Sequence, residues 1–111
     1  MAEDEDAIRR LFAGIRSFDW YPEKAAINLR DHGIDFVDAK RVFDGPTFIR
    51  RSDRYGQVRY QVFGTIEGRE VAIACTIEGG LCWIISARRA RRDERRKFHA
   101  GLAGRSPAGE D

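Results

Sequence analysis

The chain has 111 residues, of which 42% are hydrophobic and 34% are charged. This length predicts a single domain, residues 1–111, with one modest core, and the composition is neither that of a disordered protein nor that of a membrane protein. No apolar run approaches the ~20 residues of a membrane-spanning helix, and the acidic segment 1–6 lacks the basic and apolar parts of a secretory signal. The sequence therefore predicts a cytoplasmic protein whose two cysteines, Cys75 and Cys82, are reduced core thiols.

Arginine dominates the positive charge. The net charge is only +2, but 17 of the 20 basic residues are arginines, because only Lys24, Lys40 and Lys97 are lysines. Arginine binds phosphate through two hydrogen bonds and stacks on bases, so this bias suits RNA. A high genomic GC content produces the same bias. The basic run over residues 86–99 also fits a solvated helix face.

The N-terminal half predicts three helices and one short strand. Apolar residues at helical spacing predict an amphipathic helix over about residues 5–16, which packs on the domain or, as the alternative, docks on a partner. Residues 18–21 predict a short edge strand. A helix over about 22–32 follows, with proline at its first position and glycine just after its end. Another covers about 36–43 after an aspartate cap.

The C-terminal half predicts an antiparallel meander of about four strands, closed by a C-terminal helix over about 91–102. Two-residue turns place Tyr60 opposite Cys75, and Cys75 opposite Ile84, so these side chains share one face. Residues 103–111 contain glycine and proline and are expected to fray. The predicted fold class is therefore α+β. The expected strands cover 47–51, 58–66, about 71–77 and 81–87.

The face of this sheet that points away from the helices is the informative one. An open sheet face with an arginine, polar groups and aromatic rings can hold a nucleic-acid strand, because bases stack on aromatic rings. The alternative is that a helix or a partner chain covers the same aromatic residues. Phe63, Leu81, Trp83 and Ile85 would form an apolar patch that a partner protein or a second copy of the chain covers. The expected face carries Arg59, Gln61, Phe63, Thr76, Glu78, Trp83 and Ile85.

Several other kinds of site are excluded by spacing. Cys75 and Cys82 have no second pair of ligands, and His32 and His99 lack ligand spacing, so no zinc site is expected. No glycine-rich phosphate loop precedes a helix, so nucleotide hydrolysis is not expected. No histidine stands at a position that would pair it with Ser86 in a hydrolase triad. His99 is expected to be a solvated surface residue. No cofactor and no metal are predicted.

Several short segments over residues 18–98 carry a recognisable pattern. The most distinctive is Ile84-Ile85-Ser86-Ala87-Arg88-Arg89-Ala90, followed by Glu94. The others are Phe18-Asp19-Trp20, Pro22-Glu23-Lys24-Ala25, Asn28, His32-Gly33, Phe36, Ala39, Val42-Phe43-Asp44, Tyr55-Gly56, Arg59, Gly64 and Gly68-Arg69. In their order and spacing, these segments together resemble the BrnT toxin family of type II toxin–antitoxin systems.

The resemblance implies a RelE-like α+β fold and a ribonuclease toxin that cuts RNA without a metal and arrests growth. It also implies a BrnA-like antitoxin, a ribbon-helix-helix protein that neutralises the toxin and carries the complex to operator DNA. The expected assembly is a hetero-oligomer or a homodimer. The resemblance does not extend to the helix over 5–16 or to the tail.

The chain departs from the family at several positions. Acidic residues usually precede the strand arginine, where this chain has Gln57 and Val58, and arginines are common at Glu78 and Trp83. Aspartate is common at Tyr21 and tyrosine at Phe98. These changes raise an alternative function, a toxin homologue without catalysis that acts as an antitoxin-binding co-repressor. A general RNA-binding module is a third possibility, and its affinity would fall steeply with salt.

For cleavage, we expect Arg59 and Arg88 to bind the phosphate, Arg89 to assist and Trp83 to stack a base. Arg88 has the opposite strand parity to Trp83, so it is expected to act from the strand end. Asp53 and Glu94 are candidates for a general base; the alternative is that charge and positioning do most of the work. The other residues expected to bind RNA are Gln61, Phe63, Thr76, Ser86, Arg54 and Tyr55.

Overall fold

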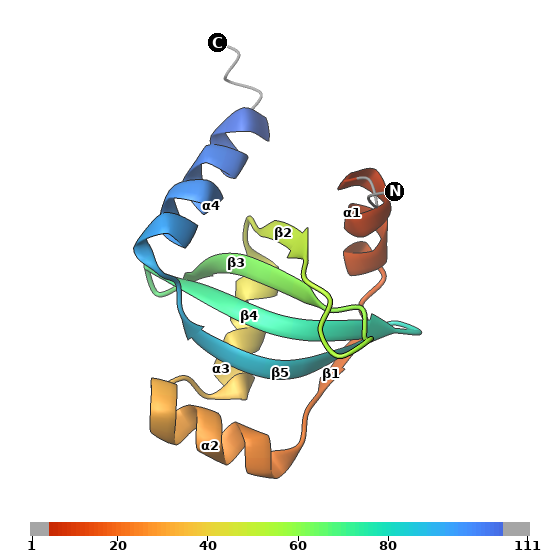
Figure 1. Cartoon of the computed structure of the whole chain (residues 1–111), viewed down its shortest axis with the longest axis vertical. Helices are drawn as coiled ribbons and strands as arrows, with labels where there is room; N and C mark the ends of the chain where they lie inside the picture. The colour runs from red at the N-terminus through yellow and green to blue at the C-terminus, as the bar shows by residue number, and fades with distance from the viewer. Residues whose placement is uncertain (1–4, 106–111) are drawn as a thin grey trace.

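The computed structural model describes residues 5–105, in which a five-stranded sheet carries helices on both faces (Figure 1). The short helix α3 lies behind the sheet in this view, and α4 rises from the left end of the sheet, where β5 ends. The elements are α1 (Glu5–Ala13), β1 (Ser17–Asp19), α2 (Pro22–His32), α3 (Phe36–Ala39), the 3-10 helix η1 (Lys40–Asp44), β2 (Phe48–Arg51), β3 (Tyr60–Ile66), β4 (Arg69–Glu78), β5 (Leu81–Arg89) and α4 (Arg92–Arg105).

The sheet is mixed, with the order β1-β5-β4-β3-β2. Strands β2 to β5 pair antiparallel with their neighbours, while β1 runs parallel to β5, with Phe18 opposite Cys82. The prediction of a four-stranded antiparallel meander was therefore wrong for the sheet as a whole. After β1 the chain passes through α2 and α3 and then forms the antiparallel strands β2 to β5. Strand β1 therefore adds to the free edge of the last strand, β5.

Element ends differ from the predictions by a few residues. The predicted helix over 36–43 is one turn of α3 followed by η1, and Asp35 caps it by accepting from the Val37 N–H at 2.9 Å. Strand β3 begins at Tyr60 rather than Val58, because the preceding residues form a turn. Helix α4 continues to Arg105, so residues 103–105 are helical, and the rest of the expected frayed tail, 106–111, lies outside the described residues.

A β-bulge sits in the pairing of β4 with β5. The predicted register is confirmed, since Tyr60 pairs with Cys75 and Cys75 with Ile84. The neighbouring residue Ala74 pairs with Ser86, so β5 carries one residue more than β4 at this point. An extra residue reverses the alternation of side chains beyond it. The bulge therefore turns Ser86 to the same face as Trp83, and Arg88 with it.

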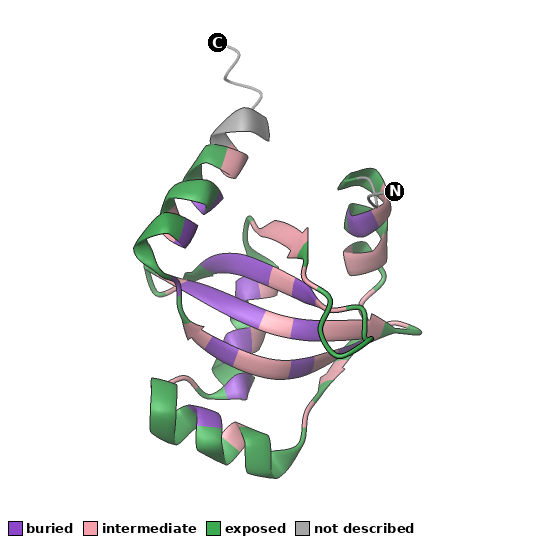
Figure 2. Ribbon diagram, viewed as in Figure 1, coloured by how far each residue is buried: buried purple, intermediate pink, exposed green. Residues whose placement is uncertain are grey.

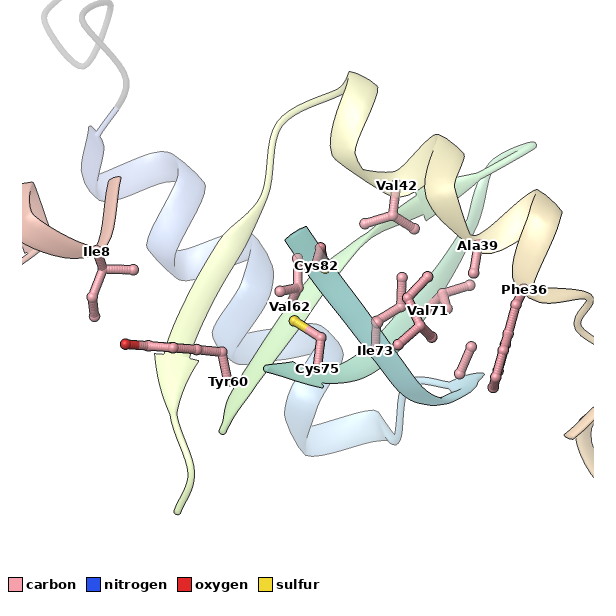
Figure 3. Close-up of a cluster of buried hydrophobic side chains, with 12 residues drawn as sticks. Ile8, Phe36, Ala39, Val42, Tyr60, Val62, Val71, Ile73, Cys75 and Cys82 are labelled. Atoms are coloured by element: carbon pink, nitrogen blue, oxygen red, sulfur yellow. The ribbon is translucent and has the colours of Figure 1, made fainter. Parts of the chain in front are cut away.

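The face opposite α4 holds the main hydrophobic core (Figure 3). Val62, Ile73 and Ile84 are each at most 1% exposed beneath α3 and η1. Both cysteines are free and buried, as predicted, and the hydrogen bond between Cys75 and Cys82 together with burial raises the pKa of the Cys75 thiol. Gly64 allows η1 to approach β3, because a Cβ there would lie 2.6 Å from a methyl carbon of Val42.

Helix α4 covers part of the front face with a second apolar cluster. Phe63 is only 2% exposed there, which confirms the alternative that a helix covers the aromatic residue and corrects the expectation that Phe63 stacks on RNA. Gly101 lets the helix lie close to β2, because a Cβ would meet the Phe48 ring at 2.5 Å. Figure 2 shows this buried stripe along α4. The cluster contains Phe63, Ala72, Ala90 and Phe98, with Phe48 and Leu102 packed against it.

Helix α1 packs on the domain, as expected. Ile8 is 9% exposed, and the Phe12 ring meets the Tyr60 ring edge-on with centroids 5.3 Å apart. Phe12 also stacks on Phe43 of η1 at 6.2 Å. Among residues 5–105, no helix is long and apolar enough to cross a membrane.

Candidate nucleic-acid site

A hollow of about 300 Å³ opens on the front face of the sheet beside α4. The loop between β2 and β3 crosses this face (Figure 1) and forms one wall, while β5 and the start of α4 form the other. We call it the arginine hollow, because four arginines reach it from these two walls. Its lining residues are Ser52, Arg54, Arg59, Tyr60, Gln61, Ala74, Ile85, Ser86, Arg88 and Arg91.

The bulge in β5 determines where Arg88 lies. Strand alternation alone would send it to the core face, but the extra residue at Ile85 brings it to the front, beside Ser86. The sequence prediction that Arg88 acts only from the strand end was therefore based on the wrong parity. Its guanidinium donates two hydrogen bonds to Glu94, at 2.8 and 2.9 Å, which is the planar paired geometry that fixes an arginine most firmly.

Glu94 holds several arginines at once. Its side chain is 1% exposed, and besides Arg88 it accepts from the Arg91 backbone N–H at 2.8 Å and forms an ion pair with the Arg91 guanidinium at 2.9 Å. The Arg50 guanidinium lies 3.9 Å away. The backbone bond is half of a capping box, because Glu94 stands at the third position of α4. The same carboxylate therefore starts the helix and orients the arginines of the hollow.

These bonds also determine the protonation of Glu94. The hydrogen bonds from Arg88 and from the Arg91 backbone lower the pKa of its carboxyl to about 2. A carboxylate with that pKa is a weak base near neutral pH, and all of its described bonds lead to arginines. The geometry thus fits a positioning residue better than the general base considered from the sequence.

Arg50 was missed in the sequence analysis. It lies on β2 opposite Gln61, and its Nε donates to the Gln61 side-chain oxygen at 2.8 Å. Its guanidinium also stacks on the covered Phe63 ring, 5.2 Å from the centroid. The pairing register of β2 with β3 could have identified it, because that register places Arg50 and Gln61 on the same face of the sheet.

The loop carries two further arginines. Arg54 and Gln57 exchange backbone hydrogen bonds at 3.0 and 2.8 Å across a two-residue turn, and Tyr55 at its tip is 90% exposed. Arg59 donates to the Gln57 side chain at 2.9 Å and lies over the Tyr55 ring at 5.7 Å. Among the ion pairs formed within residues 5–105, none involves Arg54 or Arg59. Their positive charge is therefore not neutralised by a contact.

Other predicted site residues lie apart from the hollow. Asp53 is bound by Arg51 at 2.9 and 3.1 Å, which lowers its pKa, and it does not line the hollow. Arg89 lines a different depression with His32 and Asp38, so it is separated from its neighbour Arg88. Thr76 and Trp83 pair with each other further along the front face.

Histidine and acidic side chains elsewhere in the described chain form no second site. His99 is exposed, as expected, and its Nε2 lies 2.9 Å from Glu70, whose pKa this contact lowers. In the part of the chain that the structure describes, no group of three or more histidine, cysteine or acidic side chains could hold a metal ion.

The comparisons with known proteins agree with this architecture. The solved structure of the Brucella abortus ribonuclease toxin BrnT matches with a TM-score of 0.53 and 22% identity, covering 68% of this chain and 97% of that chain, which supports the fold alone. No curated protein matches the chain. The model of the family described as "Ribonuclease toxin, BrnT, of type II toxin-antitoxin system" matches residues 20–94, which include every strand from β2 to β5. The chain therefore belongs to the BrnT family of ribonuclease toxins.

Proposed function

We propose that the chain is an endoribonuclease that cuts RNA in the arginine hollow without a metal ion. The observation that carries this proposal is Arg88, which lies in the hollow and is fixed there by buried Glu94. A cation fixed before the reaction stabilises charge that develops on a phosphate without having to reorganise. Arg54, Arg59 and Arg91 add positive charge around the same space.

The chemistry follows from RNA itself. The 2′-hydroxyl oxygen attacks the adjacent phosphorus and loses its proton, the bond to the 5′-oxygen breaks, and that oxygen gains a proton. The products are a 2′,3′-cyclic phosphate and a 5′-hydroxyl end. Arg88 is proposed to bind the non-bridging oxygens, which carry the growing negative charge, and Arg59 to bind them from the opposite wall.

The proton transfer is proposed to rely on water rather than on a tuned side chain. Glu94 and Asp53 are both bound to arginines, and both have lowered pKa values. Gln61 and Ser86 line the hollow and can hydrogen-bond the ribose or the phosphate. This arrangement supports the alternative from the sequence in which charge and positioning supply most of the rate.

The partner follows from the family. A type II toxin has a cognate antitoxin, and we propose a BrnA-like ribbon-helix-helix protein that also brings the complex to operator DNA. In the free toxin, RNA cleavage would arrest growth.

The test uses purified, antitoxin-free protein with total RNA in excess EDTA. Cleavage that leaves 2′,3′-cyclic phosphate ends, and that is lost in a variant with both Arg59 and Arg88 changed to alanine, is the expected result. A ribosome-supplemented repeat covers a requirement for translating RNA. Cleavage that depends on added metal, or that survives in the double variant, would contradict the proposal.

A second candidate is a co-repressor that binds the antitoxin but does not cleave. It is favoured by one observation: the two acidic residues considered as bases, Asp53 and Glu94, are both held by arginines. If neither assay shows cleavage while the protein still forms a complex with its antitoxin, this second function is supported instead.

A further inference from the structure

An aromatic pair stands on the front face outside the arginine hollow. The rings of Tyr21 and Trp83 meet edge to face, with centroids 4.8 Å apart and planes at 78°. Tyr21 is 58% exposed, and Trp83 is half-buried. Tyr21 is the N-cap residue of α2, but its side chain makes no capping hydrogen bond. Capping therefore does not explain why a large ring stands in water at this position.

The pair lies close to the hollow along the sheet. Trp83 is opposite Thr76 on β4, and Thr76 is two residues from Ala74, which lines the hollow. Two residues along a strand span about 7 Å. Because residues two apart point to the same face, the aromatic pair and the hollow form neighbouring parts of one surface.

We propose that Tyr21 and Trp83 form a base-binding subsite for the nucleotide next to the phosphate held in the hollow. This inference rests on the proposed function and adds a contact to the RNA substrate at a second place. A base has an apolar face that stacks on an exposed aromatic ring, whichever base it is, so the subsite would favour unpaired RNA over a duplex.

The surroundings favour a base over an apolar protein segment. The residues paired with Trp83 on the neighbouring strands are Asp19 and Thr76, so polar side chains flank the aromatic pair across the sheet. A protein segment would need a larger apolar area to dock, whereas one base covers a ring. The arginines of the hollow provide the adjacent positive charge that a polynucleotide requires.

The test measures binding of a single-stranded RNA that cannot be cut. The probe is a hepta-adenylate with 2′-O-methyl groups, and the same oligomer lacking its central base is the comparison. The chain has two tryptophans, so a Trp20→Phe background leaves Trp83 as the single one, and phenylalanine keeps an aromatic ring against Phe36 at position 20. We expect the probe to quench Trp83 fluorescence, and Tyr21→Ala to weaken binding about tenfold.

Matched variants separate stacking from damage to the fold. Tyr21→Phe keeps the ring and should bind like the parent, and Leu29→Ala, at a residue of α2 that is 49% exposed, should also change nothing. The oligomer that lacks its central base should bind the parent protein more weakly than the complete probe does. The Tyr21→Ala protein should bind the two oligomers with nearly the same affinity. In cleavage assays, Tyr21→Ala should raise KM and leave kcat within about twofold.

Three results would overturn the inference. In the first, the parent binds and cleaves RNA but Tyr21→Ala binds the probe equally well, so the subsite fails while the proposed function stands. In the second, the parent neither binds nor cleaves RNA, so both fail. In the third, Tyr21→Ala keeps RNA affinity and loses antitoxin affinity, which would assign the pair to a protein interface.

Discussion

The two walls of the arginine hollow present arginines in opposite ways. On the α4 side, Arg88 and Arg91 are fixed by a carboxylate that is 1% exposed. On the loop side, Arg59 is held by an amide and an exposed tyrosine ring. The first arrangement costs desolvation of a charge and yields a rigid guanidinium, while the second leaves a more adaptable one.

This difference indicates a division of labour. A fixed cation stabilises the transition state best, because its geometry is set before the reaction. In the proposed ribonuclease, a loop arginine without an acidic partner would attract the RNA and adjust to it. Changes on the α4 side should therefore affect the rate and the fold together, and changes on the loop side should affect mainly the rate.

The largest combined effect on stability and rate is expected from Glu94→Gln. The amide cannot hold Arg88 as an ion pair, so we expect the free energy of unfolding to fall by roughly 3 kcal/mol and cleavage to fall by about 10²-fold. Urea unfolding and a cleavage time course measure the two effects. Glu67→Gln is the matched control, because Glu67 forms an exposed pair with Arg41 and should change stability by less than about 0.5 kcal/mol. A Glu94→Gln protein with the parent's rate would remove the positioning role.

Acid should reproduce this loss in the unchanged protein. The pKa of Glu94 falls from an ordinary value near 4.5 to about 2 on folding, so the ionised carboxylate stabilises the fold at neutral pH. This stabilisation is complete above about pH 5 and is lost as the pH falls toward 2, amounting to roughly 3 kcal/mol at most. Urea unfolding at a series of pH values should show the loss, and Glu94→Gln should flatten that part of the curve. An equally steep curve in the variant would place the acid sensitivity elsewhere.

The smallest effect is expected on the loop wall. Arg59→Ala should lower kcat/KM about tenfold, because one phosphate contact is lost while Arg88 stays in place, and the unfolding midpoint should not move. Arg30→Ala, which removes an exposed arginine of α2 paired with Asp31, controls for the general loss of charge. A full cleavage rate in Arg59→Ala would show that the loop wall takes no part.

The sequence predicted the core face better than the site. Alternating apolar residues placed Val62, Ile73 and Ile84 on one face, because the two-residue period of a strand can be recognised directly in the sequence. The parallel pairing of β1 could not be predicted, since three residues carry too little pattern to choose a partner strand. The burial of Phe63 beneath a helix could be stated only as an alternative, because it depends on where α4 packs.

The site depended on two features without a local signal. The bulge at Ile85 has no glycine or proline to mark it, yet it decides that Arg88 faces the hollow. The role of Glu94 arises from contacts among β2, β5 and α4, which no single segment shows. Asn28 belongs to the same class: its side chain exchanges hydrogen bonds with the Ala87 backbone at 2.8 and 3.0 Å and so secures β5 just after the bulge.

The most direct test compares two adjacent arginines that the bulge places on different surfaces. RNA cleavage in EDTA is measured for Arg88→Ala and Arg89→Ala, with urea unfolding of both proteins to correct for stability. The account predicts that Arg88→Ala lowers the rate by about 10²–10³-fold, while Arg89→Ala stays within about twofold. Equal losses in the two variants, or a larger loss in Arg89→Ala, would contradict the placement of the ribonuclease site in the arginine hollow.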